Sequence, residues 1–305
     1  MRVLVTGAGG FVGRHLICDL IKNGHEVIAF DVDFPDLIDG ISEHVAGNIL
    51  DAESLKKVVS STKPDSCVHL AAISFAPAAK DNAQLMFSVN VVGTLNLLEA
   101  FRKNAPSARI LTISTAHVYA GITSKDPIKE DDSFAPLGLY AISKAAADKA
   151  TLEYSRLHNM HTMTARPNNH IGPGQSPVFV IASFAEQLKK MAGGSLKGSI
   201  HVGNMESMRD FSDVRDVVSA YRLLLEKGKP GRAYNISSGN MLSIRAVFDE
   251  LCNLARVWPD VVVDKERYRP TDSSPLLELG RIRQDTGWKP GTPLSQTLGD
   301  ILAEF

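Results

Sequence analysis

Cysteines are few in this sequence of 305 residues, and long apolar runs are lacking. Cys18, Cys67 and Cys252 are far apart and odd in number, which favours reduced thiols over a disulfide framework. Cys18 and Cys67 lie in predicted core elements, so we expect both to be buried. No apolar stretch is long enough to cross a bilayer, and no signal peptide is visible before the first predicted strand. We therefore expect a cytoplasmic protein without a membrane partner.

An excess of one charge is also lacking, because 33 Lys and Arg residues nearly balance 34 Asp and Glu residues, giving a net charge of -1. This balance argues against a nucleic-acid partner. The nine histidines show no metal-binding spacing, so we expect no metal site. A hydrophobic content of 44% is ordinary for a globular enzyme.

Strands and helices alternate along the first half of the chain. Strands are predicted at residues 2–6, 26–30, 43–46, 67–71, 109–113 and 161–165. Such alternation predicts an α/β protein with a doubly wound parallel sheet of the Rossmann type. We place a dinucleotide-binding domain at residues 1–166, with later returns near 211–240. A smaller, mixed α/β substrate-binding part is expected at 167–305.

The first strand is followed by Gly7-Ala8-Gly9-Gly10-Phe11-Val12-Gly13 and then by a helical pattern. Glycines at 7, 10 and 13 permit a tight turn and let backbone N–H groups approach a pyrophosphate at the start of the helix. Asp31 ends the second strand, where an acid accepts hydrogen bonds from an adenosine ribose. These features in order predict a dinucleotide site more strongly than the glycines alone.

Asp31 also bears on the choice of cofactor. Its carboxylate repels a 2′-phosphate, which favours NADH. Arg14, in the first helical turn, is a candidate partner for that phosphate and leaves NADPH as the alternative.

Tyr140 and Lys144 are four residues apart in a helix predicted from Leu139 to His158, so they share one face. A lysine ammonium near a phenol lowers the pKa of the phenol, which can then exchange a proton with an alcohol or ketone oxygen. By itself the pair is weak evidence, and a surface Tyr and Lys on a solvated helix face would be the favoured interpretation. The dinucleotide site predicted upstream favours the catalytic interpretation.

Further landmarks resemble the extended short-chain dehydrogenase/reductase family over nearly the whole chain. Besides the glycine turn they are Asn90-Val91-Val92-Gly93-Thr94, Tyr140-Ala141-Ile142-Ser143-Lys144, Arg209-Asp210-Phe211 and Arg269-Pro270-Thr271-Asp272. Within that family, the segments 165–175, 179–183, 207–211 and 213–217 look most like the GDP-6-deoxy-D-mannose reductases. Those enzymes reduce GDP-4-keto-6-deoxy-D-mannose to GDP-D-rhamnose. Asn168 departs from that group, which usually carries an aromatic residue there.

The resemblance implies a GDP-linked sugar nucleotide as substrate and assigns roles to residues. Tyr140 would act as the general acid, Lys144 would lower its pKa and bind the nicotinamide ribose, and Thr115 would hydrogen-bond the substrate oxygen. The expected cofactor-binding residues are Gly7, Gly10, Phe11, Val12, Gly13, Asp31, Asn48, Ile49, Ala71, Ala72, Asn90, Tyr140 and Lys144. The expected substrate-binding residues are Thr115, His117, Asn169, Arg209 and Arg269.

Two of these residue types have a physical rationale of their own. Arg209 and Arg269 carry guanidinium groups, whose planar donors suit a diphosphate. Asn90 is a poor helix former inside a predicted helix, so a buried polar role behind Lys144 is reasonable, with a solvent-facing Asn as the open alternative.

The family also implies a homodimer formed through the helices predicted at 83–103 and 139–158. Met86, Val89 and Leu97 are apolar residues of the first of these helices, and they would serve either the core or the interface.

Other functions remain open at this point. A nucleotide-sugar 4-epimerase would use Thr115, Tyr140 and Lys144 but retain its NAD. A non-catalytic NAD(P)-sensing protein would keep the glycine turn and dispense with Tyr140 and Lys144. Family dehydratases place an acidic residue within two positions after the threonine, where this chain has Ala116 and His117. We therefore expect no dehydration of GDP-mannose.

Overall fold

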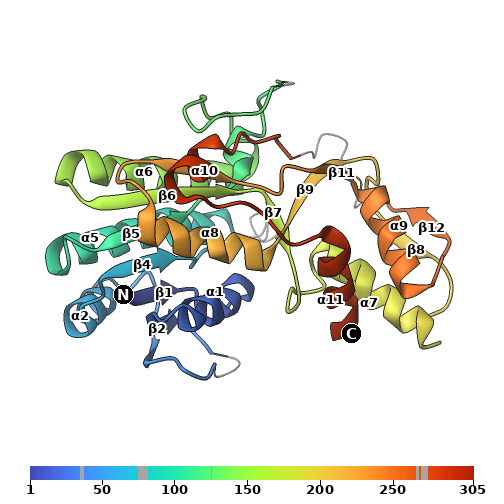
Figure 1. Ribbon diagram of the computed structural model, residues 1–305, viewed down its shortest axis with the longest axis horizontal. Helices are drawn as coiled ribbons and strands as arrows, with labels where there is room; N and C mark the ends of the chain where they lie inside the picture. The colour runs from blue at the N-terminus through green and yellow to red at the C-terminus, as the bar shows by residue number, and fades with distance from the viewer. Residues whose placement is uncertain (35–37, 75–81, 125, 266–267, 269–273) are drawn as a thin grey trace.

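The computed structural model describes residues 1–34, 38–74, 82–124, 126–265, 268 and 274–305. A seven-stranded sheet forms the larger part, and short sheets with three helices form a smaller part beside it (Figure 1). The large sheet consists of β1 (Arg2–Thr6), β2 (Glu26–Asp31), β3 (Glu43–Ala46), β4 (Ser66–His69), β5 (Arg109–Ile113), β6 (His161–Pro167) and β10 (Ala233–Ile236).

The strand order is β10-β6-β5-β4-β1-β2-β3, and every neighbouring pair is parallel. The inner strands read as continuous apolar runs because both faces of the sheet are covered. In β1, for example, Val3, Leu4 and Val5 are all buried. The predicted doubly wound, Rossmann-type sheet is confirmed.

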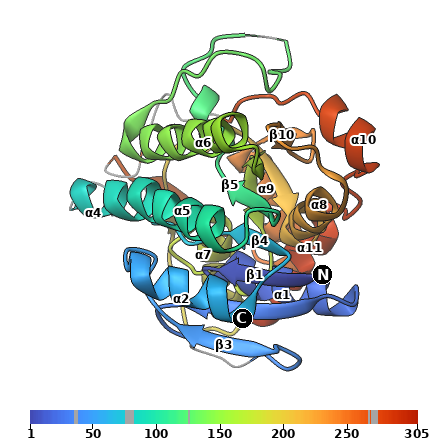
Figure 2. The same ribbon diagram turned by 90° about the vertical axis from the view of Figure 1, so that its left-hand side faces the viewer.

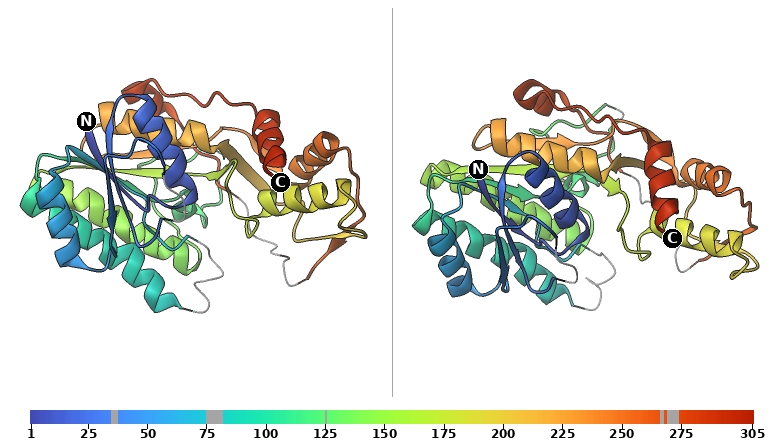
Figure 3. Two further views of the ribbon diagram at one scale, coloured as in Figure 1. Left: turned by 90° about the horizontal axis from the view of Figure 1, so that it is seen from below. Right: turned by 60° about the horizontal axis from the view of Figure 1, so that its bottom comes forward.

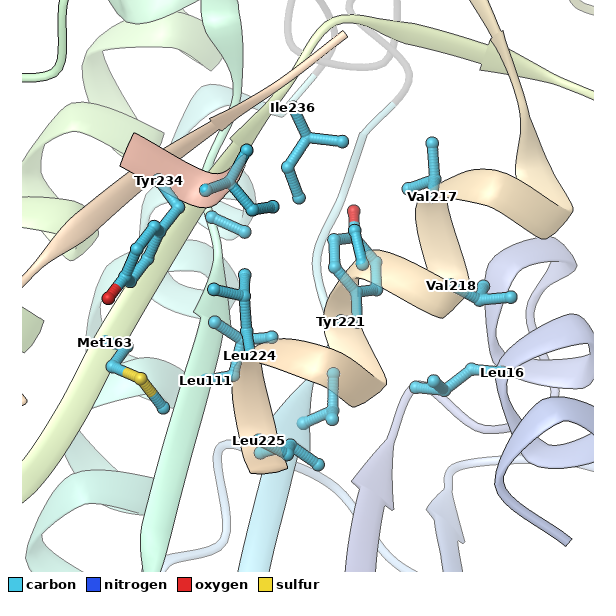
Figure 4. Close-up of a cluster of buried hydrophobic side chains, with 14 of the residues drawn as sticks. Leu16, Leu111, Met163, Val217, Val218, Tyr221, Leu224, Leu225, Tyr234 and Ile236 are labelled. Atoms are coloured by element: carbon cyan, nitrogen blue, oxygen red, sulfur yellow. The ribbon is translucent and has the colours of Figure 1, made fainter. Parts of the chain in front are cut away.

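Helices cover the two faces of this sheet (Figure 2). One face carries α1 (Phe11–Lys22) and α8 (Val214–Lys227), and the other carries α2 (Ala52–Thr62), α5 (Thr94–Asn104) and α6 (Gly138–His158). Apolar residues three and four apart on α8 face the sheet, as expected for an amphipathic helix. With Leu16 of α1 and Leu111 of β5 they form the core cluster that Figure 4 shows.

The smaller part contains two short sheets. One is β11 (Met241–Ser243), β9 (Met208–Asp213) and β7 (Asn169–Ile171), and the other pairs β8 (Ile200–Val202) with β12 (Val261–Val263). Its helices α7 (Val180–Ala192), α9 (Ile244–Ala255) and α11 (Leu294–Glu304) pack together, with the C terminus among them (Figure 3). The chain returns to the large part in α8, β10 and α10 (Gly280–Thr286).

The helix predicted at 83–103 is interrupted. It consists of α4 (Ala83–Phe87), a π-helical stretch at Ser88–Gly93 and α5. The widened turn contains Asn90, whose side chain bonds groups outside the helix. A Cβ on Gly93 would lie 2.8 Å from the side chain of Ile49, so the helix approaches that segment closely.

The expectation of a buried Cys18 is wrong. Cys18 is exposed on α1, because the buried positions of that helix are Leu16, Ile17 and Leu20 and residue 18 points away from them. Cys67 and Cys252 are buried, and all three thiols are free. Among the residues that the structure describes, no helix is long and apolar enough to cross a membrane.

A buried ion pair fastens α6 to β6. Arg166 at the end of β6 is 1% exposed, and its Nη2 lies 2.8 Å from Oδ1 of Asp148 on α6. Arg166 also donates from Nε to Asp148 Oδ2 at 2.9 Å and from Nη1 to the carbonyl of Glu130 at 2.7 Å. The Thr164 hydroxyl donates to the same carboxylate. Both charges are thereby compensated within the core.

Replacing Asp148 by Ala leaves the Arg166 guanidinium buried without its counter-ion. We expect Asp148→Ala to lower the free energy of unfolding by about 3–5 kcal/mol in urea denaturation. The control is Glu153→Ala on the same helix, whose pair with Arg156 is largely exposed. That control should change stability by no more than about 1 kcal/mol. Equal losses of unfolding free energy in Asp148→Ala and Glu153→Ala would contradict the role of the buried Asp148–Arg166 pair as the anchor of α6.

Candidate active site

A cleft of about 1510 Å³ lies between the carboxyl ends of the large sheet and the smaller part. Ligands bind at this edge in open α/β sheets. The predicted site residues that line it are Gly7, Gly10, Phe11, Val12, Gly13, Asp31, Asn48, Ile49, Ala71, Ala72, Thr115, His117, Tyr140, Lys144, Asn169 and Arg209. Asn90 lies buried behind them, and Arg269 falls outside the described residues.

The glycine turn is packed too closely for side chains. Gly7 has φ +72°, and a Cβ there would lie 2.7 Å from the backbone N of Ala71. A Cβ on Gly13 would lie 2.4 Å from the carbonyl oxygen of Gly7. The backbone at the start of α1 therefore borders the cleft directly, and its N–H groups suit a pyrophosphate. This cradle fits the phosphates of a dinucleotide.

Asp31 is held beside that turn. Its Oδ2 accepts a hydrogen bond from the backbone N of Gly9 at 2.9 Å, and its Oδ1 accepts one from Val32 at 2.7 Å. Arg14 is not among the residues that line the cleft. Its Nη2 lies 3.4 Å from where a Cβ on Gly174 would stand, beside the loop that follows β7.

Tyr140 lies in the first turn of α6 and lines the cleft together with Thr115. Burial raises the pKa of Tyr140 to about 12, and the polar side chain of Thr115 opposes this rise. The expectation that Lys144 lowers the pKa of Tyr140 is therefore wrong for the ligand-free protein, because desolvation of the phenolate outweighs the other effects. The phenol keeps its proton at neutral pH, as a proton donor requires.

Lys144 lies one turn further along α6. Burial lowers the pKa of Lys144 to about 8, and the carboxylate of Asp148 opposes the shift. Burial, and secondarily the charge of Lys144, also lowers the pKa of His69 to about 3. His69 is thus a neutral imidazole beside the charged lysine.

Of the two roles open to Asn90, the structure shows the buried polar one, since the residue is 1% exposed. Its Oδ1 accepts from the backbone N of Ile73 at 2.8 Å, and its Nδ2 donates to Ser143 Oγ at 3.0 Å. Ser143 in turn donates to the carbonyl of Tyr140 at 2.8 Å. The π-helical turn therefore supports the first turn of α6 from behind.

Sequence reasoning missed a chain of hydrogen bonds that begins at His69. Thr94 Oγ1 donates its one hydrogen to the carbonyl of Asn90 at 2.8 Å. In its contact with His69 Nε2 at 3.1 Å, the threonine oxygen is therefore the acceptor and the imidazole N–H is the donor. His69 Nδ1 then accepts from Thr6 Oγ1 at 2.7 Å. The chain joins the ends of β1 and β4 to the π-helical turn. A histidine within the apolar run Cys67–Ala71 was the available signal.

The smaller part closes the far side of the cleft. Asn169 of β7 and Arg209 of β9 line it, together with His201, Asn204 and Ser207, which the sequence did not single out. Asn168 is buried, and its Nδ2 donates to the carbonyl of Pro275 at 3.0 Å. Within the described ranges, no group of three or more His, Cys, Asp or Glu side chains could hold a metal ion.

The parallel sheet, the glycine turn and the cleft define an NAD(P)-dependent oxidoreductase of the extended short-chain dehydrogenase/reductase type. A model of the GDP-mannose 4,6-dehydratase family matches residues 4–301. The chain belongs to this family.

Two relatives are similar over the full chain. A GDP-6-deoxy-D-mannose reductase from Pseudomonas aeruginosa is 35% identical, covering 100% of this chain and 97% of that protein. A UDP-glucose 4-epimerase from Mycolicibacterium smegmatis is 30% identical, covering 100% and 98%.

Solved structures agree with these matches. The structure of RMD from Pseudomonas aeruginosa complexed with NADPH has a TM-score of 0.85 at 34% identity and covers 99% of this chain and 98% of that one. A Thermus thermophilus UDP-glucose 4-epimerase in complex with NAD has a TM-score of 0.88 at 27% identity, with 100% and 98% covered. This chain accordingly uses a nicotinamide cofactor.

The lowered pKa of Lys144 predicts a pH dependence of stability. Between the folded value of about 8 and the ordinary 10.5, the unfolded chain binds more protons, so this contribution to the unfolding free energy increases with pH. The free energy of unfolding of wild type, relative to that of Lys144→Met, should therefore increase as the pH rises from about 8 to 10.5. Over the whole of this pH range, the increase in the relative free energy of unfolding is on the order of 3 kcal/mol.

Urea denaturation of the ligand-free proteins at several pH values measures this difference. Lys149→Met, which removes an exposed lysine of the same helix, is the matched control. A wild-type advantage over Lys144→Met that stays constant with pH would refute the prediction.

Proposed function

We propose that this chain is a nucleotide-sugar 4-ketoreductase that converts GDP-4-keto-6-deoxy-D-mannose to GDP-D-rhamnose. The observation that carries the proposal is a single protonated donor, Tyr140, which lines the cleft together with Thr115 at the edge where a dinucleotide would bind. No carboxylate follows Thr115, since Ala116 and His117 occupy those positions. The similarity to the Pseudomonas aeruginosa reductase supports the choice of substrate.

The residues divide the work between binding and proton transfer. A bound reduced nicotinamide supplies the hydride that reaches C4 of the sugar. Tyr140 gives its proton to the C4 oxygen, and Thr115 orients that oxygen. The positive charge of Lys144 stabilises the phenolate that remains. One hydride and one proton convert the ketone to an alcohol.

The two sides of the cleft would bind different ligands, the cofactor on one side and the substrate on the other. The glycine turn and Asp31 would hold the phosphates and ribose of the cofactor, while Asn48, Ile49, Ala71 and Ala72 line its route along the sheet edge. Across the cleft, Arg209 is suited to the diphosphate of the substrate. Arg269, Asn169 and His117 remain proposed substrate contacts.

The test is incubation with GDP-4-keto-6-deoxy-D-mannose and reduced cofactor, with the product identified by NMR. Stoichiometric consumption of the cofactor and formation of GDP-D-rhamnose would support the proposal. A parallel incubation with GDP-mannose and NAD should yield no product lighter by one water. Dehydration there would refute the assignment.

A 4-epimerase is the second candidate, because the Mycolicibacterium smegmatis epimerase matches the whole chain. It would use the same three residues and return the hydride to the opposite face of the sugar. Cofactor that remains bound through purification, with none consumed during turnover, would favour the epimerase. A non-catalytic NAD(P) sensor is disfavoured because Thr115, Tyr140 and Lys144 are all present in the cleft.

Removing the proton donor tests the role of Tyr140. Tyr140→Phe should lower kcat by about a hundredfold or more, because general acid catalysis is lost. Cofactor affinity, measured by calorimetry, should stay close to that of wild type. A variant that retains a tenth of the wild-type kcat would contradict the role.

The position of Asp31 leads us to propose NADH as the preferred cofactor. A 2′-phosphate on the adenosine ribose would meet this carboxylate, which is already held by Gly9 and Val32. We expect a higher kcat/KM for NADH than for NADPH. In Asp31→Ser, the ratio of kcat/KM for NADH to kcat/KM for NADPH should be smaller than in wild type. A kcat/KM about tenfold higher for NADPH, equivalent to 1.4 kcal/mol, would overturn this choice.

We also propose a homodimer. Met86 and Leu97 are fully buried and belong to the core, so they do not serve an interface in this chain. An apolar groove on α4 and the π-helical turn is lined by Ala83, Phe87, Val91 and Val92 among others. Light scattering at micromolar concentration should give the dimer mass. Val92→Asp should yield monomer, whereas Val262→Asp, at an equally exposed valine of β12, should not.

A monomeric wild type under those conditions would refute the dimer. Dissociation by Val262→Asp in place of Val92→Asp would move the interface to the smaller part.

A further inference from the structure

Tyr221 on α8 carries a hydroxyl that the fold does not satisfy. The residue is 0% exposed, and its OH has no hydrogen-bond partner in the described part of the chain. Figure 4 shows the phenol among Val217, Leu224 and Ile236, with its oxygen pointing away from Leu225. A buried, unpaired hydroxyl costs about 1–3 kcal/mol, so such a group requires an explanation.

Two other fully buried tyrosines of the same core cluster are paired. The Tyr234 hydroxyl donates to Asp285 Oδ2 at 2.9 Å and accepts from the backbone N of Lys229 at 2.8 Å. The Tyr119 hydroxyl accepts from Arg166 Nη1 at 2.5 Å. The fold thus provides partners for these phenols but not for Tyr221.

Tyr221 belongs to the wall of the active-site cleft. Tyr140 lines the same cleft, and burial and then the nearby phenol of Tyr140 raise the pKa of Tyr221. Ser114, the residue before Thr115, lines the same cleft and has a second buried hydroxyl without a partner among the described residues. Two residues with orphaned hydroxyls, one on α8 and one at the end of β5, therefore line the cleft together with Tyr140.

The chemistry of these two groups restricts what can satisfy them. Each hydroxyl is both a donor and an acceptor. Neither is charged, so a phosphate is a poor match, and the glycine turn already suits the phosphates. A primary carboxamide offers an acceptor oxygen and two N–H donors within one plane. The nicotinamide ring, which must lie near Tyr140 for hydride transfer, carries such a group.

We propose that the hydroxyls of Tyr221 and Ser114 bind the carboxamide of the nicotinamide and so fix the orientation of the ring beside Tyr140. The proposal rests on the nicotinamide cofactor of the proposed reaction, and it makes Tyr221 and Ser114 cofactor-binding residues that no sequence pattern had marked.

Calorimetric titration with NADH and with ADP-ribose, which lacks the nicotinamide, tests the proposal. Tyr221→Phe removes only the hydroxyl. The Kd for NADH should rise about three- to tenfold, the loss expected for one hydrogen bond, while the Kd for ADP-ribose should stay within about twofold. Ser114→Ala should give the same pattern.

Thermal unfolding separates binding from structure. Tyr221→Phe without ligand should match or exceed the wild-type Tm, because an unsatisfied hydroxyl is removed. Tyr234→Phe is the matched control: it breaks bonds within the fold, so it should lower the Tm and leave both Kd values unchanged.

An equal loss of affinity for NADH and ADP-ribose, or no loss for either ligand, would overturn the proposal. A water molecule trapped at Tyr221 would produce the latter result. These experiments measure binding and stability, not catalytic activity. A Tyr221→Phe variant that binds NADH as tightly as wild type would therefore refute this inference without contradicting the proposed reaction. Absence of binding of both NADH and NADPH by the wild-type protein would instead defeat the proposed reaction itself.

Discussion

The site depends on how α6 is fixed to the sheet. This helix carries Tyr140, Lys144 and Asp148 at successive turns, so one rigid element holds the proposed proton donor, its cationic neighbour and the anchor. The bidentate pair of Asp148 with Arg166 attaches the helix to the end of β6. Because both charges are buried, each can be retained only while the other is in place.

Desolvation governs the chemistry of the same helix. Burial raises the pKa of Tyr140 to about 12 and lowers that of Lys144 to about 8, so at neutral pH the phenol is protonated and the ammonium keeps most of its charge. A donor that stays protonated suits a reduction, in which the ketone oxygen takes up a proton. The carboxylate of Asp148 opposes the loss of charge on Lys144. The anchor of the helix thus also contributes to the electrostatics of the site.

The cleft brings together residues from distant parts of the chain because parallel strands end at one edge. Gly7, Ala71 and Thr115 follow three different strands and border the same space. The smaller part supplies the opposite wall, with Arg209 on a strand of another sheet. We propose that the cofactor binds on the side of the large sheet and the substrate on the side of the smaller part, as the family relationship leads one to expect.

The sequence by itself determined the parallel sheet, the glycine turn and the Tyr140–Lys144 helix, because each depends on local periodicity or on glycine at fixed spacing. It did not determine the sign of the pKa shift on Tyr140, the exposure of Cys18 or the chain through His69. Tertiary structure decided these, since desolvation and hydrogen-bond partners come from residues far apart in the chain. Tyr221 shows the same limit: only packing reveals that its hydroxyl is buried without a partner.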